Sequence, residues 1–187
     1  MMIIIMGRAG TGKSSLVSEL EKRGYEKIKT CTTRPIRPGE EDGVDYFFLS
    51  DDQFKKYAEN NFFAEIKKYN TADGIWWYGT PRVELLGSDE KSVIILTPDG
   101  VRSVKPLLDK NNIKYTVVLL GAKASVIKRR MIQRGDEMDE VIRRIRADDE
   151  DFEDCEELVN LTLSNAEDHG IPALADELEE RLYGTCN

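Results

Sequence analysis

The sequence is poor in cysteine and has no long hydrophobic run. Its 187 residues contain three cysteines, Cys31, Cys155 and Cys186, at spacings that match no metal-ligand pattern. An odd number of widely separated cysteines indicates reduced thiols and not a disulfide framework. The one early apolar run, residues 1–6, is too short for a signal peptide core or a membrane span. We therefore expect a soluble, cytoplasmic protein that does not bind membranes.

Basic charge and histidine are also scarce. The chain carries 27 Lys and Arg against 35 Asp and Glu, a formal net charge of -8. A general nucleic-acid binder needs a basic face to neutralise phosphates, so this balance argues against that class. Any phosphate site must be a local gathering of cations. The single histidine, His169, falls in a polar loop and is interpreted as a surface residue, not a catalyst.

Short apolar runs alternate with stretches of helical periodicity along most of the chain. Such runs are typical of parallel strands buried on both faces. The alternation predicts an α/β fold in which helices cover both sides of a parallel sheet. We expect strands at residues 2–6, 92–96, 115–120 and 158–163, and helices at residues 14–23, 101–108, 124–134 and 172–182.

Residues 30–90 break this alternation. They contain β-prone pieces at residues 45–49, 62–68 and 76–78, and a capping-box helix start formed by Ser50 and Gln53. The pattern indicates a small, mostly antiparallel insertion. The sequence thus predicts one domain, with a core of residues 1–29, 91–124 and 156–187, this insertion, and a helical segment at residues 125–155.

A phosphate-binding motif joins the first predicted strand to the first predicted helix. Residues 7–14 match G-x-x-x-x-G-K-[ST] in the strand–turn–helix context that the motif requires. The glycines allow backbone N–H groups to converge on phosphate oxygens, a lysine can reach the β- and γ-phosphates, and a hydroxyl can ligate Mg²⁺. The predicted ATP-binding residues here are Gly7, Arg8, Ala9, Gly10, Thr11, Gly12, Lys13, Ser14 and Ser15, with Ser14 on the metal.

A second candidate phosphate site lies at residues 30–46. Pro35 and Pro38 stiffen the segment and hold Arg34 and Arg37 three residues apart, an arrangement that suits a phosphate dianion. The alternative is a polar loop whose arginines pair with the acidic residues at positions 40–42.

The second segment carries a family resemblance. Residues 32–46 complete the pattern T-T-R-x-x-R-x-G-E-x-x-G-x-D-Y, which, with the phosphate loop, resembles the guanylate kinase family over nearly the whole chain. The resemblance implies a P-loop kinase with a three-layer core, a nucleoside-monophosphate-binding subdomain at residues 30–90 and a helical lid at residues 125–155. It also implies ATP-dependent phosphorylation of GMP and dGMP with Mg²⁺.

The resemblance assigns roles on the acceptor side. It implies that Arg34, Arg37, Tyr46 and Tyr78 hold the GMP phosphate and that Thr30, Glu65 and Thr80 read guanine. A carboxylate can accept two hydrogen bonds from the N1–H and N2–H₂ edge of guanine, an edge that adenine does not offer. The alternative for Glu65 is a solvated charge beside Lys67 and Lys68.

Two departures from the family concern the acceptor base. The family's D-x-D-x-Q-G pattern is absent, and Thr97 and Asp99 are the remaining polar candidates to contact GMP there. Asp99 is displaced by two residues, so its side chain would lie on the same face of the strand if the strand continued, but Pro98 opposes that continuation. The loop at residues 70–78 is longer than usual, and packing is favoured over base stacking for its two tryptophans. A monophosphate kinase for another nucleotide is therefore the nearest alternative.

Arginines gather in the helical segment at residues 125–155. Arg130 and Arg134 share a helix face, and a second helix presents Arg143 and Arg144. The alternative is a solvated basic face paired with the acidic run at residues 148–157. The resemblance implies that Arg130, Arg134 and Arg144 stabilise the transferred phosphoryl group, together with Lys13 and Arg37. It also implies that Asn165 lies near the ATP adenine.

A non-catalytic guanylate-kinase-like interaction module is a second alternative. Such modules typically have degraded phosphate loops, whereas Gly12, Lys13 and Ser14 are intact here. The sequence therefore favours an enzyme.

Overall fold

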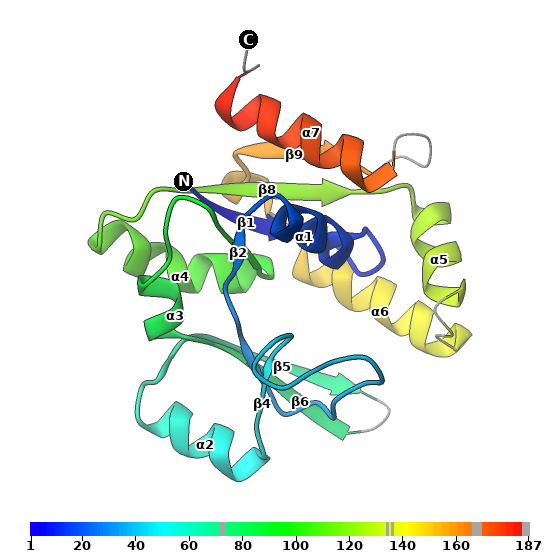
Figure 1. Cartoon of the computed structure of the whole chain (residues 1–187). Coiled ribbons are helices and arrows are strands. Elements are labelled where there is room, and N and C mark those ends of the chain that lie inside the picture. The colour runs from blue at the N-terminus through cyan, green and yellow to red at the C-terminus, as the bar shows by residue number, and fades with distance from the viewer. Residues whose placement is uncertain (72–73, 134, 136, 166–169, 185–187) are drawn as a thin grey trace.

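The computed structural model describes residues 1–71, 74–133, 135, 137–165 and 170–184. A five-stranded sheet forms its centre in the order β2-β7-β1-β8-β9, and every pairing in it is parallel (Figure 1). The central strand is buried along its whole length, as its continuous apolar sequence predicts. The strands are β1 (Met2–Met6), β2 (Glu26–Lys27), β7 (Ser92–Ile95), β8 (Tyr115–Gly121) and β9 (Leu161–Ser164).

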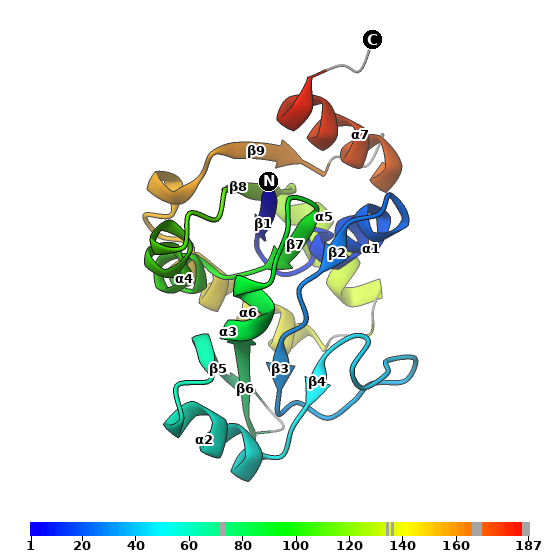
Figure 2. The ribbon, with the colours of Figure 1, turned by 60° about the vertical axis from the view of Figure 1, so that its left-hand side comes forward.

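Helices cover both faces of this sheet (Figures 1 and 2). Side chains on one face of β1, such as Ile3 and Ile5, join the apolar cluster of α1 (Lys13–Lys22) and α7 (Gly170–Tyr183). Those on the other face join the cluster of α4 (Pro98–Lys110). Because strand side chains alternate, one apolar run fills both cores. The three-layer α/β prediction is confirmed.

A second, mixed sheet forms the insertion below the core in Figure 1. It has the order β4-β3-β6-β5, with β3 and β4 parallel and the other pairs antiparallel. The helix α2 (Asp51–Glu59) begins at the predicted capping box, and its Phe54 stacks on Phe63 at 4.5 Å between ring centroids. The remaining elements are β3 (Cys31–Thr32), β4 (Phe47–Phe48), β5 (Phe63–Thr71), β6 (Gly74–Pro81) and the short helix α3 (Arg82–Leu86).

Two helices occupy the segment that was predicted to be a lid, at one side of the core (Figure 1). They are α5 (Ala124–Gln133) and α6 (Met138–Asp151), and they pack through Ile127, Met131 and Val141. A 3₁₀ turn, η1 (Glu156–Leu158), leads from α6 back to the sheet. No helix in the described part of the chain is long and apolar enough to span a membrane.

Among the predicted boundaries that differ from the structure, two at core strands have a clear local cause. The last strand occupies 161–164 and not 158–163, because Leu158 belongs to η1 and Val159 is the C-terminal cap of that turn. The third core strand ends at Ile95, since Pro98 takes the first position of α4 and the Thr97 hydroxyl caps that helix by accepting a bond from the Gly100 N–H at 3.2 Å. Asp99 therefore lies in a helix turn and not on a continued strand face.

The predicted thiols are free where they are described. Cys31 and Cys155 are both buried and unbonded to another cysteine. Cys186 and His169 lie outside the described residues.

Candidate active site

The phosphate loop requires glycine at positions where any other side chain would clash. Gly10 and Gly12 have φ angles of 75° and 98°, in the left-handed region. A Cβ on Gly12 would also lie 2.4 Å from Asn165 Nδ2, and a Cβ on Gly7 would lie 2.5 Å from the Leu120 carbonyl oxygen. The motif's glycines thus let the loop curl against β8 and the chain after β9.

Side chains brace this loop from both sides. Lys13 Nζ donates to the carbonyl oxygens of Gly7 at 2.7 Å and Arg8 at 2.9 Å. Asn165, only 4% exposed, donates from Nδ2 to the Thr11 carbonyl oxygen at 2.7 Å. The ammonium group is therefore held over the loop where bound phosphates would lie.

Gly12→Ala is expected to destabilise the fold by about 3 kcal/mol, through backbone strain plus the clash with Asn165. Gly24→Ala is the matched control, because Gly24 has a φ of 84° and open space around its Cβ position. Urea unfolding of both variants and of the wild type measures how much free energy of unfolding each variant loses. Equal losses would show that the approach of Asn165 contributes nothing.

On the acceptor side, Arg34 is buried and Arg37 is not. Arg34 Nη2 pairs with Glu40 Oε1 at 2.8 Å, and its Nε donates to the Tyr78 hydroxyl at 3.1 Å. Burial lowers the pKa of Arg34, but the bonds to Glu40 and Tyr78 outweigh that effect and raise it overall. The alternative of acidic pairing thus applies to Arg34. Arg37 lines the cleft, and among the described residues its guanidinium makes no hydrogen bond or close ion pair with a side chain.

Two tyrosines complete this side. The rings of Tyr46 and Tyr78 meet edge to face, 6.0 Å between centroids, and the Arg34 guanidinium lies 5.5 Å from the Tyr46 ring centroid. Burial raises the pKa of Tyr46, so its phenol keeps a proton to donate at neutral pH.

Glu65 and Thr80 are neighbours across the β5–β6 hairpin. The Thr80 hydroxyl donates to Glu65 Oε1 at 2.7 Å, and Glu65 is 9% exposed. Burial raises the pKa of Glu65, opposed by the bonds from Thr80 and by the charge of Lys67. Glu65 is therefore not the solvated surface charge of the alternative interpretation.

A single cleft of about 510 Å³ brings the two ends of the site together. The phosphate loop, the acceptor sheet and the lid helix α6 all line it. Its predicted site residues are Gly7, Ala9, Lys13, Ser14, Thr30, Arg37, Tyr46, Glu65, Tyr78, Thr97 and Arg144. Its other lining residues include Lys67, Tyr69, Trp76, Arg143, Asp148 and Asp151.

Other predicted residues lie behind the cleft lining or away from it. Arg34 and Thr80 support lining side chains through the bonds described above. Arg130 contacts Asn165 Oδ1 at 3.2 Å and the Thr11 carbonyl oxygen at 3.4 Å, at the back of the phosphate loop. The Asp99 carboxylate pairs instead with Lys67 and Arg102. Outside the lining are Arg8, Gly10, Thr11, Gly12, Ser15, Arg34, Thr80, Asp99, Arg130 and Asn165, whereas Arg134 lies outside the described residues.

The two tryptophans of the long hairpin lie in different environments. Trp77 stacks near Phe54, 6.1 Å between centroids, in the small core of the insertion, whereas Trp76 lines the cleft. The packing interpretation therefore holds for Trp77 only.

Acidic residues of α6 reach the phosphate loop, a contact that the sequence pattern did not indicate. Asp148 Oδ2 accepts a bond from the Ala9 N–H at 2.6 Å, and Asp149 pairs with Arg8. Arg144, Asp148 and Asp151 are four and three residues apart, so helical spacing was the available signal that they share a face. A phosphate oxygen bound to this amide must displace Asp148.

Glu140 holds the two lid arginines that line the cleft. It accepts bonds from Arg143 at 2.7 and 2.8 Å and from Arg144 at 2.7 Å. The bonds from Arg143, followed by those from Arg144, lower the pKa of Glu140 to about 2.

Glu140→Gln is expected to lower the free energy of unfolding at pH 7 by about 1 kcal/mol, after allowance for solvent screening. Because the folded pKa lies below the unfolded value near 4.5, this stabilisation is complete above pH 4.5 and disappears as the pH falls toward 2. Urea unfolding of both proteins at pH 7, 4 and 3 measures the difference. A gap between them that stays constant over this range would contradict the assignment.

Comparison with known proteins identifies the family. The sequence model of guanylate kinase matches residues 1–180 of the chain. The chain belongs to the guanylate kinase family. A guanylate kinase of Hydrogenovibrio crunogenus is 37% identical over 153 residues, which is 79% of this chain and 71% of that protein. One from Lactobacillus johnsonii is 30% identical over 180 residues, 90% of this chain and 85% of that protein.

A solved structure agrees in fold. The guanylate kinase of Anaplasma phagocytophilum superposes with a TM-score of 0.65 at 18% identity, over 97% of this chain and 84% of that one. Membership of the guanylate kinase family makes the protein a nucleoside-monophosphate kinase, so the predicted enzyme class is confirmed.

Proposed function

We propose that this protein transfers the γ-phosphoryl group of ATP to GMP, and to dGMP, giving ADP and the corresponding diphosphate. One observation carries the proposal: the phosphate loop, the acceptor arginine Arg37 and the buried Glu65 line the same cleft. Phosphoryl transfer requires mainly in-line positioning of two anionic substrates and cations around the shifting charge, and this cleft provides both.

The donor end suits ATP with Mg²⁺. Backbone amides of residues 7–14 and the N-terminus of α1 would hold the β- and γ-phosphates, with Lys13 across them. The Ser14 hydroxyl lines the cleft, and among the described residues it has no hydrogen-bond partner. It is thus available as a hard oxygen ligand for Mg²⁺, which usually completes its shell with water and phosphate oxygens. Bound there, the ion would neutralise charge on the phosphates. Asn165 would help position the adenine end.

The acceptor end suits a purine monophosphate. Arg37, together with Arg34, Tyr46 and Tyr78, would bind its phosphate, because guanidinium and phenol groups donate hydrogen bonds to phosphate oxygens. Glu65 would accept bonds from guanine N1–H and N2–H₂, with Thr30, Thr80 and Thr97 nearby. Asp99 would act on the base only indirectly, through its ion pairs.

The lid would place positively charged side chains around the transferred phosphoryl group. Arg144 and Arg143 line the cleft from α6, and Arg130 belongs to the helix that flanks the phosphate loop. Arg134, which lies outside the described residues, is proposed for the same role from the sequence alone. Closure around both nucleotides would exclude water as a competing acceptor. The acceptor oxygen of a monophosphate is already anionic, so no residue need act as a strong base. We place the protein in the cytoplasm, where both nucleotides are supplied.

The proposal is tested by ADP production with ATP, Mg²⁺ and a panel of monophosphates. GMP and dGMP are expected to be phosphorylated well above AMP, CMP and UMP. Turnover of another monophosphate, with GMP and dGMP both inactive, would overturn the guanine assignment. Calorimetry without ATP uptake in the presence of Mg²⁺ would overturn the kinase assignment as a whole.

A further inference from the structure

A lysine lies beside the base-reading carboxylate on the same face of β5. Side chains at alternate positions of a strand share a face, and Glu65, Lys67 and Tyr69 all line the cleft. The Lys67 side chain is 20% exposed. The cleft thus contains a cation two residues from the acceptor Glu65, in addition to the phosphate-binding arginines.

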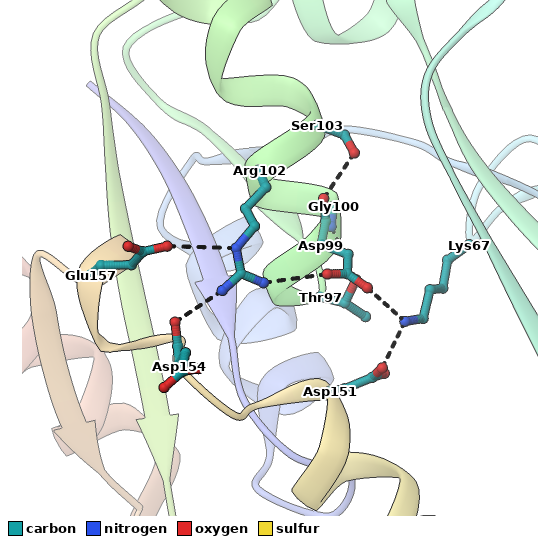
Figure 3. Close-up of polar contacts among 9 residues, drawn as sticks. All are labelled: Lys67, Thr97, Asp99, Gly100, Arg102, Ser103, Asp151, Asp154 and Glu157. Atoms are coloured by element: carbon teal, nitrogen blue, oxygen red, sulfur yellow. Dashed lines mark hydrogen bonds and ion pairs between the residues drawn. The ribbon is translucent and has the colours of Figure 1, made fainter.

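Figure 3 shows how the ammonium group of Lys67 is held in place. Its Nζ donates to Asp151 Oδ1 of α6 at 2.8 Å and to Asp99 Oδ2 of α4 at 3.3 Å. Arg102 in turn pairs with the other oxygen of Asp99 at 3.3 Å and with Glu157 at 3.7 Å. Lys67 comes from the insertion, Asp99 from the core and Asp151 from the lid, so three parts of the molecule define its position.

A count of donors leaves one N–H group of Lys67 available. An ammonium has three donors, and Asp99 and Asp151 take two of them. The third has no acceptor among the residues that the structure describes. The hydroxyl of Thr80 has a single hydrogen, which it donates to Glu65. Within this arrangement Lys67, and not Thr80, has a hydrogen to offer an acceptor atom of the base.

The guanine edge presents two donors, N2–H₂ and N1–H, followed by the acceptor O6. Glu65 complements the donors, and a cationic donor beside it complements O6. We propose that Lys67 is a specificity-determining residue that donates its third N–H to O6 of the GMP base, with Asp99 and Asp151 as its positioning partners. This inference rests on the proposed function. It also gives the chain a base contact where the family's strand-end aspartates are absent.

The test compares GMP with 6-thio-GMP, which keeps N1–H and N2–H₂ but replaces O6 with a weakly accepting sulfur. In Lys67→Met, kcat/KM for GMP is expected to fall roughly 10- to 100-fold, the usual effect of losing a hydrogen bond from a charged group. The value for 6-thio-GMP is expected to change no more than about threefold, since the lost donor contributes little there. The preference for GMP should therefore fall by at least about threefold, and by up to about 100-fold.

Lys56→Met is the matched control, because Lys56 is an exposed lysine of α2 in the same insertion. Its kinetics with both nucleotides should equal those of the wild type. A Lys67→Met protein that loses the same factor with both nucleotides would show a purely structural ion pair and overturn the inference. A Lys67→Met protein with full activity and an unchanged preference for GMP over 6-thio-GMP would also overturn it. A wild-type protein inactive with GMP would overturn the proposed function itself, a result distinct from either.

Discussion

Lys13→Met is expected to lower kcat for GMP phosphorylation about 10³-fold, the usual order for removing a preorganised cation from a phosphoryl-transfer site. Lys13 Nζ is held by two carbonyl oxygens of the phosphate loop, so the charge is in place before the reaction begins. Because charge shifts toward the β–γ bridge in the transition state, kcat should fall further than KM for ATP rises. Steady-state kinetics with varied ATP measures both.

Lys22→Met is the matched control for this variant. Lys22 lies on the same helix, α1, with a side chain 73% exposed, and its ion-pair partner among the described residues is Glu19. It should keep wild-type kcat. A Lys13→Met protein that remains folded and retains more than about a tenth of wild-type kcat would contradict the assigned role of the ammonium group.

Glu65→Gln is expected to lower kcat/KM for GMP about 10²- to 10⁴-fold, because two hydrogen bonds to a buried charge are lost or reversed. The amide NH₂ of glutamine would face the N–H donors of guanine. The same amide can pair with adenine, so the ratio of GMP to AMP turnover should fall further than GMP turnover alone. ADP production with both monophosphates measures the ratio.

Glu59→Gln serves as the control, since Glu59 is an exposed residue at the end of α2. It should behave as the wild type with both substrates. If Glu65→Gln kept its preference for GMP over AMP, the carboxylate would not be the group that reads the base.

Much of the backbone geometry of the phosphate loop could be predicted because it is encoded locally. The loop of residues 7–14 follows a buried strand and precedes a helix, and its positive φ angles at Gly10 and Gly12 are what its glycines indicate. The capping box of Ser50 and Gln53 is local in the same way. In such segments, a few consecutive residues carry the whole geometric requirement.

The polar contacts among distant segments could not be predicted. The alternative interpretation paired the acidic run at residues 148–157 with the basic face of the helical segment, whereas Asp148 contacts Ala9 and Asp151 contacts Lys67. Lys67 itself appeared only as a charged neighbour of Glu65, in the alternative interpretation that left Glu65 exposed to solvent. Charges on separate elements have no fixed distance until those elements pack, so pairing depends on tertiary placement.

The sequence by itself determined the α/β class, the phosphate loop and the membership of a kinase family, because apolar periodicity and motif spacing are properties of neighbouring residues. Only the tertiary structure decided which side chains share the cleft. In the folded protein Arg34 is buried and paired with Glu40, and Arg37 lines the cleft. Lys67 forms ion pairs with Asp99 of α4 and Asp151 of α6. The physical reason is that burial and ion pairing are set by the packing of elements far apart in the chain, which periodicity does not record.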